Sequence, residues 1–370
     1  MTSPRARGRR MDKAAVAVLF GGRSSEHSIS SATAGGVLRA IDRERYRVIP
    51  IGITREGAYV LEDDEPDKFS LDPAHLPEVR DNGTRIIWPD SASSRELRVR
   101  DADGERSLGE VDVVFPILHG RFGEDGTIQG FLELLDLPYV GAGLLMSAIG
   151  MDKHTTKSVL KAAGVPVVPW VTVTRRDLAR DRELWLRRIR ALDLPLFVKP
   201  ARAGSSVGVS KVSDLGELDA ALDTAFAEDG TVLVEQAVVG REIECGVLAS
   251  RDGGLPRVSV AGEIVLDGRE FYDFEAKYLD VPGVALTCPA DLRDGELAEM
   301  QRIAARAFEA IGGEGLARVD FFYTGTDFFV NELNTMPGFT PISMFPKCWI
   351  ASGMTYPELI TELIEIARAA

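Results

Sequence analysis

The chain has 370 residues, of which 45% are hydrophobic and 27% are charged, so it is long enough for two or three domains of a globular protein. Asp and Glu number 57 against 43 Lys and Arg, which gives a formal net charge of −14. A surface of this sign repels phosphate backbones and argues against a nucleic-acid-binding protein.

The N-terminus combines four arginines within residues 1–12 with a short apolar run at 14–20. Gly21, Gly22 and Arg23 follow this run, where a signal peptide would have a small-residue cleavage site. We therefore expect a disordered basic tail over 1–12 and then a buried first strand. No later stretch reaches the roughly 18 apolar residues that a membrane span needs, so no membrane partner is expected.

Short β-branched runs alternate with helical stretches in the first 141 residues, a pattern typical of α/β layers. The expected strands lie at 14–20, 48–53 and 111–118, and the expected helices at 30–41 and 127–135. Residues 61–108 are acidic and dotted with prolines, so we expect a loop that carries one hairpin. The strands predict a parallel sheet that binds ligands at its carboxyl edge.

The rest of the chain mixes helices and strands. The expected helices lie at 152–163, 184–192, 218–226, 296–311 and 357–367. The expected strands lie at 171–173, 196–199, 232–235, 243–248, 257–260, 316–323 and 328–331. A polar loop at 267–283 follows the strand at 257–260.

Three cysteines and four histidines limit the chemistry that the chain can support. The cysteines follow no CxxC spacing, and the histidines follow no HExxH spacing. This argues against a disulfide framework or a zinc site and fits a reducing cytoplasm. Any metal should therefore be a hard cation bound by oxygen ligands.

The most informative polar residues lie on the last two predicted strands. Arg318 and Asp320 alternate with apolar residues and so share one strand face, as do Glu332 and Asn334 on the next strand. If the hairpin loop between them has an odd number of residues, Asp320 lies opposite Glu332. Two carboxylates and an amide suit Mg²⁺ bound together with nucleotide phosphates. The alternative is the exposed charged face of a hairpin.

Polar loops also follow three other predicted strands. Lys199 ends a strand, and a Gly/Ser loop follows it as far as Gly208. The backbone N–H groups of this loop could close over phosphates. The alternative is a plain β-hairpin. His119 and Glu124 lie in a glycine-rich loop after an apolar strand, and Glu26 follows the first strand. These last two loops could face one cleft, although His119 alone could equally be a structural histidine.

Seven motifs follow one another along the chain. They are GGRSSEHSIS from Gly21, LHGRFGEDG from Leu118, MDKHTTK from Met151, VKPARAGSSVGV from Val198, FYDFEAKY from Phe271, RVDFF from Arg318 and NELNTMPGFTPIS from Asn331. Together they resemble the D-alanine–D-alanine ligase family of the ATP-grasp superfamily, from residue 14 to the C-terminus. The resemblance implies an N-terminal parallel-sheet α/β domain followed by a two-subdomain ATP-grasp fold of the α+β type.

The resemblance also implies a domain organisation. The expected parts are a basic tail at 1–12, an N-terminal α/β substrate domain at 13–141, a central ATP-grasp subdomain at 142–238, and a C-terminal ATP-grasp subdomain at 239–370 with a lid loop at 267–283. The N-terminal domain would hold the first substrate, and the two subdomains would bind ATP between their sheets. The resemblance assigns no role to the basic tail or to residues 61–108.

The resemblance further implies residues for ATP and for the metal. The residues that match ATP-binding positions are Lys153, Lys199 and Lys277 at the phosphates, Glu235, Gln236 and Val238 at the adenine, and Glu242 at the ribose. Gln236 departs from the lysine often found at its position. Asp320, Glu332 and Asn334 match the ligands of Mg²⁺ or Mn²⁺, with two ions expected.

A second set of residues matches substrate-binding or catalytic positions. They are Glu26, His119, Ser205, Tyr278, Arg318 and Gly338, with Ser343 and Met344 at the carboxylate of the second amino acid. Glu26 would bind the ammonium group of the first D-alanine, while Ser205 and Tyr278 would tie the lid over the site. Arg318 and the N–H of Gly338 would stabilise oxyanion charge, as such donors do in acyl transfer.

The implied activity is ATP-dependent ligation of two D-alanines through an acyl phosphate, for peptidoglycan precursor synthesis in the cytoplasm. Because an acyl phosphate hydrolyses readily, the reaction needs a lid that excludes water. The alternatives are a D-alanine–D-lactate ligase, a broader ATP-grasp ligase and a non-catalytic nucleotide-binding module. A tyrosine at position 278 resembles the dipeptide-forming members and favours D-alanine as the acceptor. The expected partners are D-alanine and ATP, and a homodimer stays open.

Overall fold

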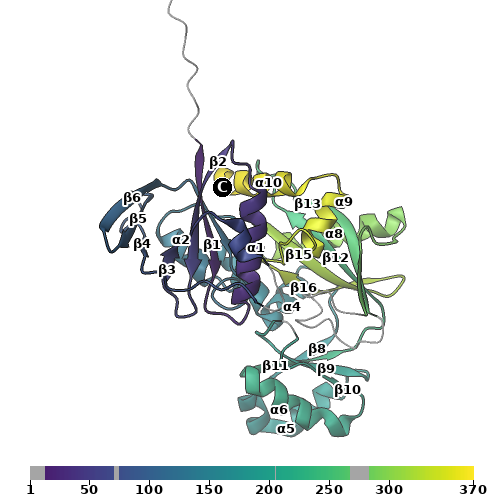
Figure 1. Cartoon of the computed structure of the whole chain (residues 1–370). Coiled ribbons are helices and arrows are strands. Elements are labelled where there is room, and N and C mark those ends of the chain that lie inside the picture. Colours follow the sequence, from purple (N-terminus) through teal and green to yellow (C-terminus); the bar gives the residue numbers. More distant parts are fainter. Residues whose placement is uncertain (1–12, 71–74, 205, 267–282) are drawn as a thin grey trace, which may run out of the picture.

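The computed structural model describes most of the chain, namely residues 13–70, 75–204, 206–266 and 283–370. These residues form four β-sheets. Figure 1 shows the N-terminal sheet beside the C-terminal sheet, with a smaller central sheet below them. The expectations for Ser205, Lys277, Tyr278 and nearly all of the lid loop lie outside the described residues. None of the described helices is long and apolar enough to cross a membrane.

The N-terminal sheet is built on three parallel strands that are largely buried. They are β1 (Ala14–Gly21), β2 (Tyr46–Ile53) and β7 (Val113–Ile117), and the short antiparallel β3 (Tyr59–Leu61) lies at one edge. The two sheet faces are covered by α1 (His27–Ala40) and α2 (Thr127–Leu134). Val18 of β1 packs on the α1 side, and its neighbour Leu19 packs on the α2 side. Burial on both faces explains the continuous apolar run of the first strand.

A separate antiparallel sheet lies between β3 and β7, where we expected a loop with one hairpin. Its strands are β4 (Arg85–Ile87), β5 (Glu96–Asp101) and β6 (Gly104–Glu110). The region therefore holds more regular structure than expected. Strand β6 escaped prediction because it is an edge strand whose side chains are mostly exposed, so its sequence has no apolar alternation.

The central sheet has the strand order β10-β9-β11-β8 and is antiparallel. The strands are β8 (Trp170–Thr174), β9 (Leu196–Pro200), β10 (Ser210–Val212) and β11 (Thr231–Gln236), and the helices α5 (Arg175–Ile189) and α6 (Leu218–Glu228) cover one face. Val198 and Val234 face these helices. Because side chains alternate along a strand, Lys199 and Glu235 project from the opposite face.

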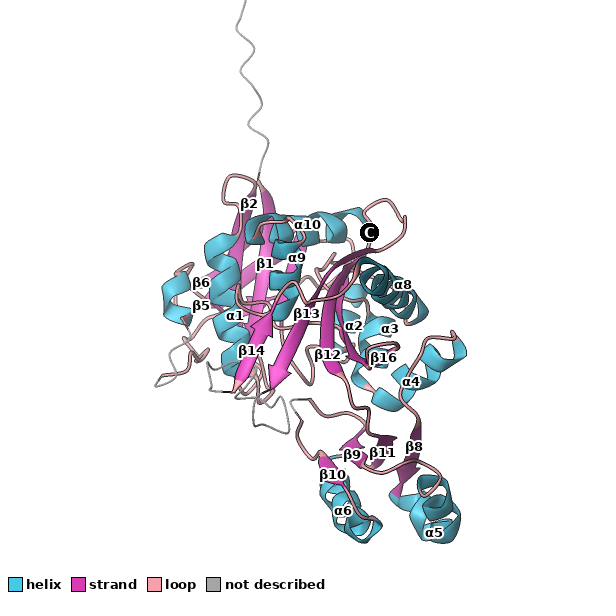
Figure 2. Cartoon of the chain, turned by 90° about the vertical axis from the view of Figure 1, so that its right-hand side faces the viewer, coloured by secondary structure: helices cyan, strands magenta, loops and turns pink. Residues whose placement is uncertain are grey.

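The C-terminal sheet has the strand order β14-β13-β12-β15-β16. The strands are β12 (Arg241–Leu248), β13 (Arg257–Leu266), β14 (Val284–Thr287), β15 (Leu316–Tyr323) and β16 (Phe328–Asn334). One face packs against α8 (Asp294–Ala310), and α3 (Leu144–Met151) and α4 (Lys153–Ala162) complete the same apolar core. Figure 2 shows α3 and α4 on the C-terminal sheet, above the central sheet.

The N-terminal and C-terminal sheets share a second core. Helices α9 (Met344–Ala351) and α10 (Tyr356–Ala369) contribute to it together with β1, β7 and α1. The central sheet and its two helices have a core of their own. Helix α9 was not expected because Pro346 lies within it, although proline is tolerated in a first helical turn. Short 3₁₀ turns at Pro66–Phe69 and Leu215–Glu217 complete the described elements.

Candidate active site

Asp320 and Glu332 lie directly opposite each other on β15 and β16. The loop between the strands has four residues, 324–327, and this even number alone would pair Asp320 with Asn331. A register shift between Asp320 and Phe321 instead makes Asn331 the extra residue of a β-bulge. The predicted pairing of the two carboxylates is therefore present, but a bulge produces it and not an odd loop.

Arg318 is the centre of a buried charge cluster on the same sheet face. Its Nε and Nη2 atoms donate to the two carboxylate oxygens of Asp320, each at 2.7 Å, and Nε lies 3.1 Å from Oε2 of Glu244 on β12. Asn334 Nδ2 donates to Asp320 Oδ2 at 2.9 Å. Burial alone would lower the pKa of Arg318, but the charges of Asp320 and Glu244 raise it well above its ordinary value.

The same face offers oxygen donors that suit a hard cation. Asp320 and Glu332 supply carboxylates, and the Asn334 amide presents oxygen in place of nitrogen when it turns over. In the described part of the chain, no three acidic, histidine or cysteine side chains converge on one point. A divalent ion would therefore complete its shell with phosphate oxygens and water, as Mg²⁺ commonly does. These residues fit a cation that binds together with a nucleotide.

A buried cluster of one glutamate and two lysines lies on the face of the central sheet that is turned away from α5 and α6. Glu235 Oε2 is 2.6 Å from Lys199 Nζ, and its Oε1 is 3.2 Å from Lys157 Nζ. Burial alone would raise the pKa of Glu235, but the two ammonium groups hold it below its ordinary value. Burial lowers the pKa of Lys157, whose side chain is almost fully enclosed. Two ammonium groups around one carboxylate leave an excess of positive charge, which suits an anionic ligand at Lys199, the more exposed of the two lysines.

Lys153 connects the loop after β9 with the carboxylates of the C-terminal sheet. Its Nζ donates to the carbonyl oxygen of Ala203 at 2.8 Å and lies 3.7 Å from Glu332 Oε2. The predicted phosphate-binding loop, the predicted phosphate lysine and the predicted metal face therefore lie together.

Three of the four residues predicted for adenine and ribose lie at the connection between the central and C-terminal sheets, and the fourth, Glu235, lies in the lysine cluster on β11. Gln236 ends β11, Val238 lies in the connection, and Glu242 is the second residue of β12. The Oε1 atom of Gln236 accepts the N–H of Asp193 at 3.4 Å, which holds this side chain against the turn before β9. Glu242 projects from the same sheet face as Glu244 because the two residues alternate along β12.

The two glycine-rich loops of the N-terminal sheet meet at its carboxyl edge. Ser24 Oγ donates to the carbonyl oxygen of His119 at 2.7 Å. A Cβ atom on Gly120 would lie 2.8 Å from Glu26 Oε2, so the Glu26 carboxylate lies against the backbone of the second loop. His119 Nδ1 lies 3.1 Å from the carbonyl oxygen of Met336, which ties the loops to the segment after β16. Burial lowers the pKa of His119, so the neutral ring donates through Nδ1–H.

Glu124 is a second carboxyl group in this loop. The N–H of Gly120 donates to its Oε2 at 2.5 Å, and Thr335 Oγ1 donates to its backbone carbonyl at 3.3 Å. Burial and the neighbouring charge of Glu26 raise the pKa of Glu124 to about 8. Glu124 is therefore mostly protonated at neutral pH and adds no second negative charge beside Glu26.

The residues predicted for the second amino acid lie at the start of α9, and their side chains are already engaged. Ser343 Oγ lies 2.8 Å from Thr340 Oγ1, and it accepts the N–H of Thr340 at 3.2 Å. Met344 is 3% exposed and packs in an apolar cluster with Cys348. The backbone N–H groups in the first turn of α9 are the donors that a carboxylate could use there. Gly338 lies in the segment between β16 and α9.

Lys157 and Glu244 were not among the predicted site residues, and Glu124 was named in the predicted binding loop but was given no role of its own. Lys157 follows Lys153 by one helical turn, a spacing that places both on one side of α4. Glu244 follows Glu242 by two residues, which places both on one strand face. Glu124 lies between glycines in a loop after a buried strand. Spacing pointed to the first two residues, but only the fold shows how they are paired.

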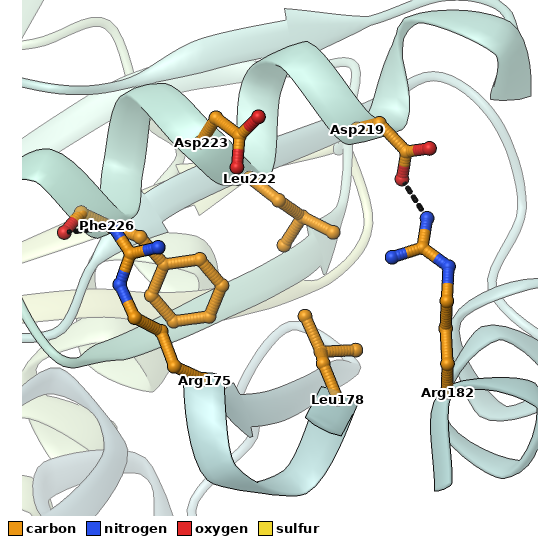
Figure 3. A pocket seen from close by; sticks show the side chains of 7 residues that line it. All are labelled: Arg175, Leu178, Arg182, Asp219, Leu222, Asp223 and Phe226. Atoms are coloured by element: carbon orange, nitrogen blue, oxygen red, sulfur yellow. Dashed lines mark hydrogen bonds and ion pairs between the residues drawn. The ribbon is translucent and has the colours of Figure 1, made fainter. Parts of the chain in front are cut away.

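The described part of the structure has two notable cavities, one beside the predicted site residues and one away from them. One, of about 360 Å³, lies between the β1–α1 and β7–α2 loops and is lined by His119, Phe122 and Phe131 among others. The other, of about 290 Å³, lies between α5 and α6 and holds none of the predicted site residues. Figure 3 shows the ion pair between Arg182 and Asp219 at one side of this second cavity.

Comparison with known proteins connects both halves of the chain to one family. The family model described as "D-ala D-ala ligase N-terminus" matches residues 15–142, and "D-ala D-ala ligase C-terminus" matches residues 159–365. A D-alanine–D-alanine ligase of Paenarthrobacter aurescens is 51% identical over 95% of this chain and 94% of that protein. A D-alanine–D-alanine ligase of Kineococcus radiotolerans is 53% identical over 96% of each chain.

Solved structures give the same result for the fold. The VanG D-Ala:D-Ser ligase from Enterococcus faecalis matches with a TM-score of 0.81 and 34% identity, over 96% of this chain and 99% of that one. The D-alanine–D-alanine ligase from Coxiella burnetii matches with a TM-score of 0.79 and 38% identity, over 96% and 94%. These likenesses confirm the predicted N-terminal α/β domain followed by an ATP-grasp fold. The chain therefore belongs to the D-alanine–D-alanine ligase family.

Proposed function

We propose that this enzyme joins two D-alanines to D-alanyl-D-alanine at the expense of ATP, as a step of peptidoglycan precursor synthesis. The observation that carries the proposal is the pairing of Asp320 with Glu332 beside Arg318, within reach of Lys153. This arrangement supports a nucleotide, a divalent cation and a developing anion at one place. Full-length relatives that carry the name D-alanine–D-alanine ligase support the choice of substrate.

The enzyme belongs to a family that uses ATP and a divalent cation. We assign Asp320, Glu332 and Asn334 to the cation, Mg²⁺ or Mn²⁺, and we propose two ions. When bound, the cation neutralises phosphate charge and so lets an anionic nucleophile approach. Lys153 and Lys199 would hold phosphate oxygens in exchange for their present carboxylate partners, and Lys277 would add a third contact.

The first D-alanine would lie between the N-terminal loops and the C-terminal sheet. Glu26 would pair with its ammonium group, and His119 would fix the loop that holds Glu26 in place. A protonated Glu124 supports this assignment because it leaves Glu26 as the carboxylate for the ammonium group. The D-alanine carboxylate would then attack the γ-phosphorus of ATP, which gives an acyl phosphate and ADP.

The amine of the second D-alanine would attack the acyl phosphate, and phosphate would leave. Arg318 uses Nε and Nη2 for Asp320, so we assign its Nη1 to the oxyanion, together with the N–H of Gly338. The first turn of α9, from Ser343 and Met344, would bind the carboxylate of the second D-alanine. Tyr278 and Ser205 would close the site and favour an amine acceptor over a hydroxyl acceptor.

Release of ADP with different acceptors tests the proposed function. We expect release with ATP, Mg²⁺ and D-alanine, and D-alanyl-D-alanine as the product found by mass spectrometry. When D-lactate or D-serine is added at the same concentration as D-alanine, only a small fraction of the product should contain it. An ester product would favour the D-lactate alternative, and tight ATP binding without ADP release would favour a non-catalytic module. We also propose that the reaction takes place in the cytoplasm, where ATP is available. The molar mass measured by light scattering would decide whether the enzyme is a homodimer.

A further inference from the structure

Cys288 and Cys348 are in contact at the end of the site that we assign to the second amino acid. Their sulfur atoms lie 3.8 Å apart. Cys348 lies on α9, and Cys288 directly follows β14. The proposed ligation uses neither thiol, so their contact calls for a separate explanation.

One pair of strands holds both cysteines in place. Cys348 Sγ lies 3.8 Å from the carbonyl oxygen of Glu244 on β12, and Cys288 Sγ lies 3.8 Å from the carbonyl oxygen of Ala261 on β13. The N–H of Ala290 donates to the same Ala261 carbonyl at 2.7 Å, which anchors the segment after β14. Figure 2 shows α9, β13 and β14 in one region of the molecule. Because β12 and β13 are paired, the two thiols are held together by the sheet.

The two thiols differ in access and in acidity. Cys288 is partly exposed, whereas Cys348 is buried. The hydrogen bond with Cys348 lowers the pKa of Cys288 more than its partial burial raises it, and the charge of Lys347 acts in the same direction as the hydrogen bond. The same hydrogen bond, together with burial, raises the pKa of Cys348 well above its ordinary value. An oxidant from solvent therefore meets Cys288 first, with Cys348 directly behind it.

Cys245 is an internal control for this pair. It lies on β12 and packs in the core beneath α8. It is buried, and burial raises its pKa well above the ordinary value. Cys245 therefore reports the reactivity of a thiol in this fold that lacks access to solvent.

We propose that Cys288 and Cys348 are an oxidation site for hydroperoxides and that oxidation closes them into an intramolecular disulfide. The Cys288 thiolate attacks one peroxide oxygen, so that an S–O bond forms, the O–O bond breaks, and hydroxide or alkoxide leaves. The Cys348 sulfur then attacks the Cys288 sulfur, the S–S bond forms, and the oxygen leaves as water with the Cys348 proton. In total the two thiols lose two electrons and two protons, and the peroxide is reduced to water, or to water and an alcohol.

This disulfide would alter the start of α9. Bonded sulfur atoms lie about 2.05 Å apart, so the two sulfur atoms must approach by about 1.8 Å from their present distance. Met344 precedes Cys348 by one helical turn and packs in the same apolar cluster. Oxidation should therefore weaken binding of the second D-alanine and leave ATP binding unchanged. This effect on activity rests on the proposed function, whereas formation of the disulfide does not.

Mass spectrometry of the reduced full-length protein tests the proposal. The protein is treated with a small molar excess of hydrogen peroxide, alkylated with N-ethylmaleimide and digested. We expect the loss of two alkylatable thiols and a linked peptide pair that contains Cys288 and Cys348, both reversed by dithiothreitol. Cys245→Ala should behave like the wild type. Cys348→Ala should accumulate a sulfenic acid at Cys288 that dimedone traps.

Two results would overturn the disulfide: loss of all three thiols at one rate, or wild-type oxidation that stops at Cys288 without a linked peptide. Activity is measured on the same samples. We expect the KM for the second D-alanine to rise about tenfold in the oxidised wild type, with the KM for ATP unchanged, and no such rise in Cys348→Ala. A linked protein with an unchanged KM would overturn the effect on the site. Because the mass measurement needs no turnover, it remains decisive even if the proposed ligation is wrong.

Discussion

Asp320 faces Glu332 across the β15–β16 pair because Asn331 is an extra residue in the second strand. The bulge moves every later residue of β16 by one position relative to β15, so Asn334 lies opposite Arg318. Without this shift the even hairpin loop would place Glu332 on the apolar face beneath α8. The proposed cation site therefore depends on one inserted residue.

Glu332→Gln should weaken the dependence of activity on Mg²⁺. The change keeps the shape of the side chain but removes a charge that we assign to the cation, so we expect the Mg²⁺ concentration for half-maximal ADP release to rise about 10- to 100-fold. A Mg²⁺ titration of ADP release measures this. Glu263→Gln on β13 is the matched control, because Glu263 pairs with Arg241 in the same sheet and is not assigned to the cation. An equal effect of both substitutions would contradict the assignment.

Glu235→Gln should destabilise the protein strongly. It leaves Lys157 and Lys199 close together without their shared carboxylate, and breaking a buried ion pair in this way costs about 3–5 kcal/mol. Urea unfolding measures the loss. Arg182→Gln, which breaks the exposed pair with Asp219, should cost less than about 1 kcal/mol. Similar losses in free energy of unfolding for the two variants would show that the buried cluster stabilises the protein no more than the exposed ion pair does.

The raised pKa of Glu124 predicts a pH dependence of stability. In the unfolded chain its pKa is near 4.5, and in the folded protein it is about 8, so the folded state binds the proton more tightly. The stability that Glu124 contributes is complete below pH 4.5 and is lost as pH rises toward 8. The side chain in Glu124→Gln stays neutral at every pH. The difference in free energy of unfolding, variant minus wild type, should therefore increase between pH 5 and 8. Parallel pH profiles for the two proteins would contradict the shift.

Gly120→Ala should impair binding of the first D-alanine. Gly120 has a φ of +71°, and a Cβ atom there would lie 2.8 Å from Glu26 Oε2, so the added methyl group pushes the carboxylate aside. We expect the KM for the first D-alanine to rise about tenfold, in addition to the loss of stability that a positive φ imposes. Gly83→Ala is the control, because its φ is +82° and a Cβ atom there meets nothing within 4 Å. An equal KM for the first D-alanine in both variants would show that Gly120 does not affect binding of this substrate.

Much of the fold and part of the site could be predicted from the sequence. Apolar runs gave the buried strands of the N-terminal sheet, and alternation along β15 and β16 gave the shared face of Asp320 and Glu332. The bulge at Asn331 could not be predicted, because nothing in its side chain marks an unpaired strand position. The edge strand β6 has one apolar residue, Leu108, and so shows no apolar alternation. The carboxylate partner of Lys157 comes from a distant strand. Tertiary contacts alone determine these features.

The most direct test of the proposed ligation follows oxygen from substrate to product. D-alanine labelled with ¹⁸O in its carboxylate is incubated with the enzyme, ATP and Mg²⁺, and the inorganic phosphate is examined by mass spectrometry. If the carboxylate attacks the γ-phosphorus, each turnover transfers one ¹⁸O atom to phosphate. Unlabelled phosphate formed together with D-alanyl-D-alanine would contradict the acyl-phosphate route.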